Sequence, residues 1–222
     1  MARFSRIDVV LKMKETGMIP IFYNPQVEVV KQVVKASYDA GVRVFEFTNR
    51  GDFAYEVFAE LNKWATKEIP DLILGVGSVV DAGTASLYLQ LGANFIVSPV
   101  LKEEIAIVCN RRKIAWSPGC GSVNEISRAE ELGAEVVKMF PDICIGGPKF
   151  VAAVKGPCPW TSIMPTGHIE PTEECLKPWF DAGVFCVGML FPPDVIAASD
   201  WSKITELCRN ALDIIKKIRK QK

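Results

Sequence analysis

Two charged side chains interrupt apolar, strand-like runs, and their types could do chemistry together. Lys138 lies between Val137 and Met139 in EVVKMFP, and Glu46 lies in VRVFEFTNR. Burial disfavours an ammonium ion, which lowers the pKa of the amine and frees it to attack a carbonyl carbon. A carboxylate beside that amine can relay protons. The pattern predicts a lysine nucleophile with a glutamate relay, and the alternative is a structural ion pair.

The residues that follow the strand-like runs form a second group of candidates. Arg50 stands four residues after Glu46, where a guanidinium would grip a substrate carboxylate, although an exposed arginine without a role fits equally. His168, in MPTGH, could be an acid, a base, an anion contact or a hydrogen-bonded loop histidine. Several runs end in glycine or proline, which lets backbone amides approach an anion but also suits ordinary turns. These segments are GVGSV (75–79), SPV (98–100), SPGCGS (117–122), FPD (140–142), IGGP (145–148) and MPTGH (164–168).

The elements that would position these residues recur along the chain. Eight apolar runs follow one another at intervals of 20 to 30 residues, which leaves room for one strand, one helix and two short loops. The runs begin near Met18, Val42, Leu72, Asn94, Ile114, Glu135, Thr161 and Val184. Apolar periodicity predicts helices between them, for example over 27–38 and 53–64. Gly41, Gly92, Gly133 and Gly183 would end such helices.

Eight strand-helix units in a chain of this length predict a (β/α)₈ TIM barrel over a single domain, residues 1–222. An extra N-terminal helix is expected over 4–15. The alternative is a doubly wound open sheet, which the glycine-free first turn FYNPQV disfavours. In a barrel the carboxyl ends of all strands meet at one mouth, so we expect Glu46 and Lys138 to face each other there.

Composition excludes several classes of function. The 222 residues carry 26 basic and 26 acidic side chains, which argues against a nucleic-acid partner. A single histidine, His168, cannot build a multi-histidine metal site, so we expect neither a metal nor a cofactor. Seven cysteines without C-x-x-C spacing indicate reduced thiols. With no signal-peptide core and no apolar run near the ~20 residues that span a bilayer, we expect a soluble, cytoplasmic protein without a membrane partner.

Read in order, these segments resemble the 2-keto-3-deoxy-6-phosphogluconate aldolase / 4-hydroxy-2-oxoglutarate aldolase family. The resemblance runs from about Ile19 to Pro192. The segments that carry it are VRVFEFTNR (42–50), GVGSV (75–79), FIVSP (95–99), PGCGS (118–122), VKMFP (137–141), GGPKF (146–150) and MPTGHI (164–169). It implies a metal-free class I aldolase that cleaves a small 2-oxo acid to pyruvate and an aldehyde, and a homotrimer.

The resemblance also implies roles for individual residues. Lys138 would form the Schiff base with the 2-oxo carbon, and Glu46 would relay protons. Substrate would be bound by Arg50 and Ser78, which hold the pyruvate carboxylate, by Pro99, Phe140 and Thr166, which shape the pocket, and by Gly167 and His168. The family usually has two glycines at the last two positions, so His168 is a departure.

A second departure concerns phosphate binding. After the last strand the family usually carries a Gly-Ser segment, whereas here Gly188 leads through Met189 and Leu190 into two prolines. Two lost charge-assisted contacts of about 1.5–3 kcal/mol each would cost about two to four decades with phosphorylated substrates, unless His168 compensates as a cation. We therefore expect retained lyase chemistry with an altered preference for phosphate.

Four other readings stay open at this stage. One is an aldolase for an unphosphorylated 2-keto-3-deoxy sugar acid. Another is a non-catalytic barrel scaffold with a decayed phosphate site. A third is a different lysine-dependent barrel enzyme, such as a deoxyribose-phosphate aldolase or a transaldolase, which the Glu46-to-Arg50 motif disfavours. A metal-dependent aldolase is disfavoured by the single histidine.

Overall fold

Strands and helices alternate along the chain in the computed structural model, which describes residues 2–220. Met1, Gln221 and Lys222 belong to the expected domain of 1–222 but lie outside the described residues. The strands are β1 (Met18–Phe22), β2 (Val44–Thr48), β3 (Ile73–Gly77), β4 (Phe95–Val97), β5 (Ala115–Ser117), β6 (Gly119–Cys120), β7 (Val137–Met139), β8 (Ile163–Pro165) and β9 (Val187–Leu190). Each of the eight apolar runs thus contains a strand.

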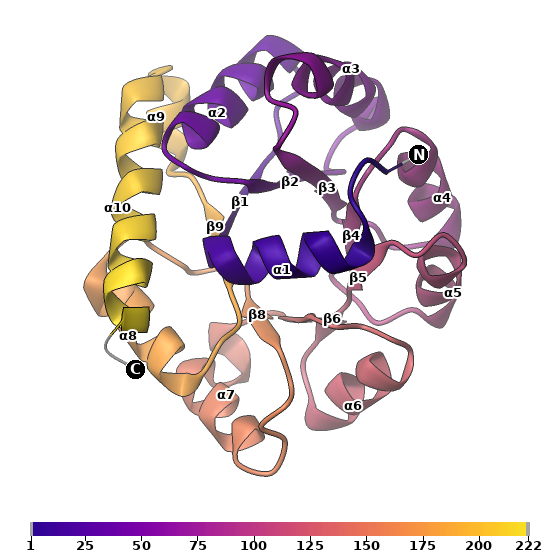
Figure 1. Cartoon of the computed structure of the whole chain (residues 1–222), viewed down its shortest axis with the longest axis vertical. Coiled ribbons are helices and arrows are strands. Elements are labelled where there is room, and N and C mark those ends of the chain that lie inside the picture. The colour runs from indigo at the N-terminus through magenta and orange to yellow at the C-terminus, as the bar shows by residue number, and fades with distance from the viewer. Residues whose placement is uncertain (1, 221–222) are drawn as a thin grey trace.

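Apart from α1, the helices surround the strands on the outside (Figure 1). They are α1 (Arg6–Thr16), α2 (Val27–Asp39), α3 (Ala54–Glu68), α4 (Ala82–Gln90), α5 (Glu103–Arg111), α6 (Val123–Glu131), the short 3₁₀ turn η1 (Ile143–Ile145), α7 (Gly147–Lys155), α8 (Glu173–Ala182), α9 (Pro193–Ala197) and α10 (Trp201–Lys220). The helices predicted over 27–38 and 53–64 correspond to α2 and α3. No helix within residues 2–220 is both long enough and apolar enough to cross a membrane.

All strand pairs are parallel, as an α/β chain of this pattern requires. One sheet has the order β5-β4-β3-β2-β1-β9, and a second has the order β6-β7-β8. Pro118 lies between β5 and β6. Parallel pairing puts the carboxyl ends of the strands in each sheet at one edge, where the candidate side chains were expected.

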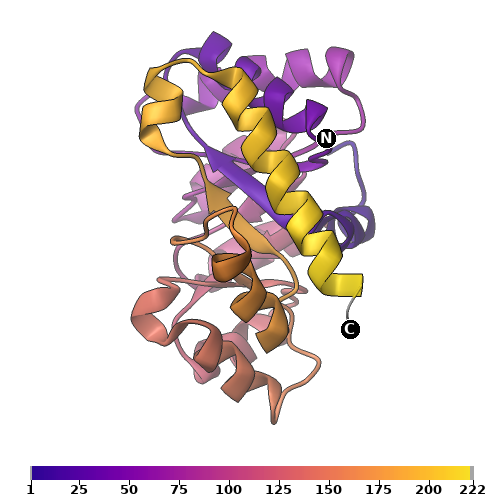
Figure 2. The same cartoon turned by 90° about the vertical axis from the view of Figure 1, so that its left-hand side faces the viewer.

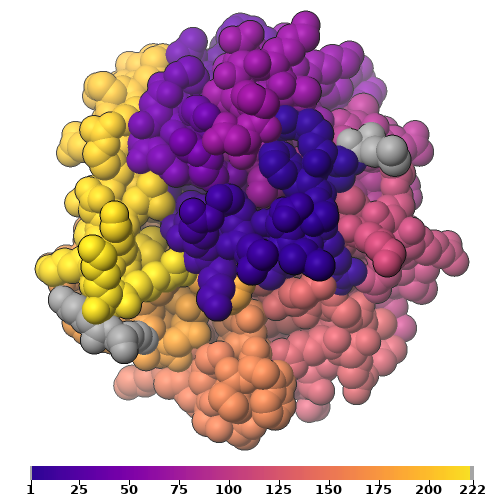
Figure 3. All heavy atoms as spheres, in the orientation of Figure 1, coloured from indigo at the N-terminus to yellow at the C-terminus, as the bar shows by residue number. Residues whose placement is uncertain are grey.

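Strand side chains alternate between two apolar clusters. Phe45 and Phe47 belong to the larger one, which lies between the strands and the surrounding helices. Val44 belongs to the smaller one, which gathers residues near the starts of several strands and includes Val9 and Met13 of α1. In Figure 1, α1 lies across the strands, and in Figure 3 its atoms fill the middle of that face. This helix therefore closes the end of the strand assembly from which the strands start.

The last helix ties the two ends of the described chain together. In Figure 2, α10 crosses the side of the molecule toward α1. The Arg219 guanidinium donates to the backbone oxygens of Lys14, at 2.6 Å, and Phe185, at 2.8 Å. It therefore joins α10 to the last turn of α1 and to the segment that leads into β9.

Candidate active site

Glu46 and Lys138 are both buried, with 1% and 5% of their surfaces exposed. Val137 and Met139 face the outer helices, so alternation along β7 turns Lys138 to the opposite side, which is also the side of Val44 and Glu46 on β2. The two groups interact electrostatically. Oε2 of Glu46 has no hydrogen-bond partner, and no direct ion pair joins the two side chains.

Glycines in β3 make the space that Glu46 occupies. A Cβ atom on Gly77 would collide with Oε1 of Glu46, and one on Gly75 would collide with the ring of Phe95. Gly75 pairs with Glu46 in the register of β2 and β3. The sequence pattern placed these glycines near a strand end, as possible anion contacts or as ordinary turn residues. Gly75 lies within β3 and Gly77 is its last residue, and both leave room for larger neighbouring side chains.

The surroundings shift both pKa values toward the neutral forms. Burial raises the pKa of Glu46, against the opposing effects of Lys138 and Arg50. Burial lowers the pKa of Lys138. Arg50 lowers it further, whereas Glu46 and Asp142 raise it. The amine is therefore neutral more often at a given pH than an exposed lysine, as a nucleophile for a carbonyl carbon needs.

Arg50 and Ser78 meet at the ends of β2 and β3. Nε of Arg50 donates to Oγ of Ser78 over 3.3 Å. Ser78 holds φ at +60°, in the left-handed region that non-glycine residues rarely adopt. Arg50 is exposed, and Ser78 is half-buried. The two side chains present a cation and a hydroxyl at adjacent strand ends, which suits a carboxylate ligand.

Phe140 and Thr166 lie at the ends of the neighbouring strands β7 and β8. The Phe140 ring centroid is 4.9 Å from Nζ of Lys138. Thr166 is buried, and its Oγ1 has no hydrogen-bond partner in the protein. Pro99, after β4, is half-buried, and its backbone leaves no room for a Cβ atom on Gly119.

His168 is held to Asp142, a residue that sequence reasoning missed, and Gly167 packs beside the same carboxylate. Asp142 is fully buried; its Oδ2 accepts from the backbone N–H of His168, and its Oδ1 lies 3.0 Å from Nδ1 of the imidazole. The side chain of His168 is 64% exposed. The only indication in the sequence was the segment FPD at a strand end. That segment is typical of an ordinary turn, and the importance of Asp142 appears only once its contact with His168, 26 residues later, is known.

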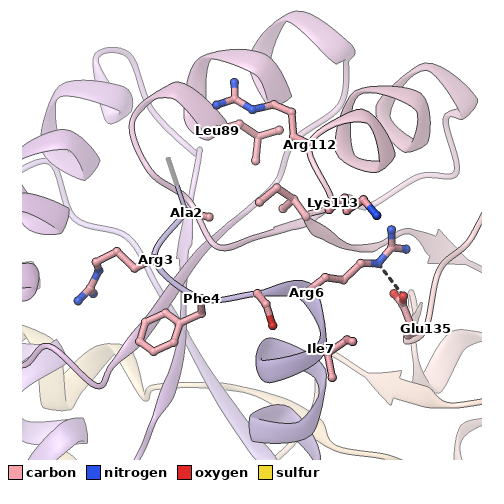
Figure 4. Close-up of a pocket in the computed structure, with 11 residues that line it drawn as sticks. Ala2, Arg3, Phe4, Arg6, Ile7, Leu89, Arg112, Lys113 and Glu135 are labelled. Carbon is pink, nitrogen blue, oxygen red and sulfur yellow. Dashed lines mark ion pairs between the residues drawn. The ribbon is translucent and has the colours of Figure 1, made fainter.

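A cavity of about 710 Å³ lies away from these residues, between the N-terminal segment and the turn from α5 to β5 (Figure 4). Arg3, Arg6, Arg112 and Lys113 line it, and Nε of Arg6 pairs with Glu135 at 2.6 Å. It contains none of the predicted site residues. Among residues 2–220 no group of three or more histidine, cysteine, aspartate or glutamate side chains is placed to hold a metal ion.

Comparison with known proteins identifies the family. The family model described as "KDPG and KHG aldolase" matches residues 9–207. A 2-dehydro-3-deoxy-phosphogluconate aldolase of Pseudoalteromonas atlantica is 34% identical over 88% of this chain and 89% of its own. The KHG/KDPG aldolase of Escherichia coli K12 is 30% identical over 88% of this chain and 91% of its own.

A solved structure agrees with the sequence matches. The KDPG aldolase of Legionella pneumophila, with pyruvate captured as a covalent carbinolamine, is 27% identical and superposes with a TM-score of 0.82. The match covers 91% of this chain and 97% of that one. These findings confirm the resemblance seen in the sequence. The chain belongs to the KDPG and KHG aldolase family, whose members are lyases.

Proposed function

We propose that this protein is a class I aldolase that cleaves 2-keto-3-deoxy-6-phosphogluconate, 4-hydroxy-2-oxoglutarate or both. The observation that carries the proposal is the buried amine of Lys138, whose pKa is lowered and which faces the side of Glu46 without a direct ion pair. A family whose relatives are named for these substrates supports it. So does the pyruvate carbinolamine of the Legionella enzyme.

The substrate is held by its carboxylate at Arg50 and Ser78, which places its 2-oxo carbon near Lys138. Phe140 and Pro99 shape the pocket around that end. Thr166, Gly167 and His168 line the part occupied by the aldehyde-forming half. The positions of these side chains after the carboxyl ends of β2, β3, β4, β7 and β8 support this arrangement.

The reaction proceeds through a Schiff base at Lys138. The neutral amine adds to the 2-oxo carbon, and the protonated carboxyl group of Glu46 gives its proton to the carbinolamine hydroxyl, which leaves as water so that an iminium ion and the Glu46 carboxylate remain. Glu46, as a carboxylate, takes the proton of the C4 hydroxyl, the C3–C4 bond breaks, and its electron pair passes into the iminium as an enamine. The aldehyde is released, the enamine is protonated at C3, and water hydrolyses the resulting iminium to pyruvate and free lysine.

A scaffold role, the second reading from the sequence, receives less support from the geometry. In that reading Glu46 and Lys138 form a structural ion pair, which would need direct contact to offset the cost of burying both charges. Oε2 of Glu46 instead lacks any hydrogen-bond partner. Buried Glu46 and Lys138 without a direct ion pair lower the stability of the fold, but both remain able to bind and react with a substrate.

Trapping with pyruvate and borohydride tests the proposal. The reduced Schiff base should add stable mass to the peptide that contains Lys138, and Lys138→Met should abolish both the adduct and cleavage. Lys155 is the matched control, because burial also lowers its pKa while it donates to the backbone oxygens of Pro159 and Thr161. Lys155→Met should retain the adduct. Labelling elsewhere, or cleavage by Lys138→Met, would refute the proposal.

The proposal extends to the complete barrel and to the assembly. We infer one (β/α)₈ barrel domain with α1 as an extra helix, because Pro118 joins the two sheets along the chain and a bridge from Thr166 to Gly188 links β8 to β9.

We also infer a homotrimer, from the family resemblance, and a cytoplasmic location, which seven free thiols suit. Analytical ultracentrifugation of the purified protein tests the trimer.

A further inference from the structure

Asp142 is a buried carboxylate that the proposed reaction does not use. Its side chain is 1% exposed. Oδ1 accepts from the backbone N–H of Ile143 at 2.8 Å, and Oδ2 accepts from that of His168 at 2.9 Å. Nδ1 of His168 lies 3.0 Å from Oδ1. Asp142 therefore fixes both the backbone and the ring of His168, and it connects the end of β7 to the end of β8.

These contacts define which nitrogen of His168 remains free. Both oxygens of Asp142 accept from N–H groups, as an ionised carboxylate does, so Nδ1 carries the hydrogen in its contact with Oδ1. A carboxylate on one ring nitrogen sets the tautomer and orientation of the imidazole. Nε2 then points away from Asp142, on a side chain that is 64% exposed, and it has no partner among the described residues.

The loop before His168 is built around the same carboxylate. Gly167 has φ of +147°, a conformation that side-chain-bearing residues rarely adopt. A Cβ atom there would lie 2.8 Å from Oδ1 of Asp142. Any larger residue would displace the carboxylate or the loop, so the glycine permits the contact between Asp142 and His168.

The Asp142–His168 pair borders the reacting groups. Asp142 acts electrostatically on Lys138, and Thr166, two residues before His168, carries the free buried hydroxyl. Arg50 and Ser78 follow β2 and β3, which belong to the other sheet. A 2-oxo acid held there by its carboxylate and joined to Lys138 would extend its far end toward His168.

We propose that Asp142 is a positioning residue that holds His168 as a hydrogen-bond donor for an anionic group at the end of the substrate remote from the 2-oxo carbon. This inference rests on the proposed function. It favours substrates that end in a carboxylate or a phosphate over those that end in a hydroxyl. As an imidazolium, His168 donates through Nε2 to that anion, while the Asp142 carboxylate balances its charge.

Three substrates distinguish the far ends: 4-hydroxy-2-oxoglutarate with a carboxylate, 2-keto-3-deoxy-6-phosphogluconate with a phosphate and 2-keto-3-deoxygluconate with a hydroxyl. In His168→Ala and Asp142→Asn, the ratio of kcat/KM for an anionic substrate to that for 2-keto-3-deoxygluconate should fall about tenfold or more, mainly through KM. A fall with only one anionic substrate identifies which anion is recognised. Asp39→Asn, which removes a surface carboxylate paired with Lys35, should leave the ratio unchanged.

The double variant tests whether Asp142 acts through His168. If it does, Asp142→Asn/His168→Ala should show the same ratio as His168→Ala alone. Independent, additive losses would overturn the positioning role, and equal losses with all three substrates would overturn the whole inference. If Asp142→Asn fails to fold, the ratio in His168→Ala still decides whether the exposed ring selects anions. Borohydride trapping at Lys138 in each variant separates a failure of this inference from a failure of the proposed function.

Discussion

At the scale of single residues, the proposed reaction depends on two buried side chains, Glu46 and Lys138, which interact electrostatically but form no direct ion pair. Burial opposes the charged form of both Glu46 and Lys138, yet their mutual attraction and Arg50 modify each shift. Small changes in the surrounding charges should therefore move the reactivity of the amine in either direction.

Two substitutions should shift the pH dependence of Lys138 reactivity in opposite directions. The neutral amine reacts with acetic anhydride, so labelling should rise with pH about a midpoint below 10.5, the ordinary lysine value. Arg50 lowers the pKa of Lys138, so Arg50→Gln should move the midpoint up. Glu46 raises that pKa, so Glu46→Gln should move the midpoint down, with cleavage reduced about 10²- to 10⁴-fold. Competitive labelling with peptide mapping measures both shifts, and shifts of the same sign would contradict this account.

The residues that could be found from the sequence were those that violate a local rule. Lys138 and Glu46 stand out because charged side chains are rare in buried strands, and the structure buries both. Asp142 could not be found in this way. An aspartate after a strand is ordinary turn chemistry, and its importance depends on a partner brought near by folding.

At the scale of elements, the strand runs and their parallel arrangement were predictable, because apolar runs and regular spacing are local signals. The residues at which the strands begin and end were harder to predict. The last strand was expected from Val184 but begins at Val187, since Phe185 and Cys186 precede the paired segment. The steric need for the glycines of β3 could not be predicted from the sequence, because only the neighbouring strands show what a side chain there would strike.

Replacement of one β3 glycine should therefore damage the site from within an element. In Gly77→Ala the added methyl group would displace the Glu46 carboxylate, which should lower kcat/KM at least about tenfold and cost about 1–3 kcal/mol of unfolding free energy. Cleavage assays and urea unfolding measure the two effects.

Gly156 provides the matched control for this substitution. It lies at the end of α7 with φ of −58°, and the nearest atom to an added Cβ is the backbone oxygen of Ala153 at 3.5 Å. Gly156→Ala should keep full activity and gain about 0.4–1 kcal/mol of stability. Normal activity in Gly77→Ala would show that Glu46 does not need the space.

At the scale of the whole molecule, the guanidinium of Arg219 on α10 holds this helix to α1 by donating to backbone oxygens rather than to a carboxylate. Arg219 donates to Lys14 and Phe185, and burial lowers its pKa. The sequence could predict that both helices exist, but their contact over about 200 residues of separation has no local signal. Loss of this contact should lower the stability of the fold without changing the positions of Lys138 and Glu46.

Arg219→Ala should therefore cost about 1–3 kcal/mol of unfolding free energy, because several backbone oxygens lose a charged donor. Its kcat should match the parent at temperatures where both are folded. Lys217→Ala removes an exposed ion pair with Glu173 and should cost less than about 1 kcal/mol. Urea unfolding of both variants checks the difference, and equal costs would mean that Arg219 is only a surface charge.

The closure of one end by α1 has a kinetic consequence. Val9 and Met13 pack among residues near the starts of the strands, so in the proposed barrel the substrate enters and the products leave at the opposite end. Lys138 is buried, whereas the side chain of His168 is 64% exposed. In the proposed reaction the pyruvate half stays bonded to Lys138 after the C3–C4 bond breaks, so we expect the aldehyde to leave first and pyruvate to leave last.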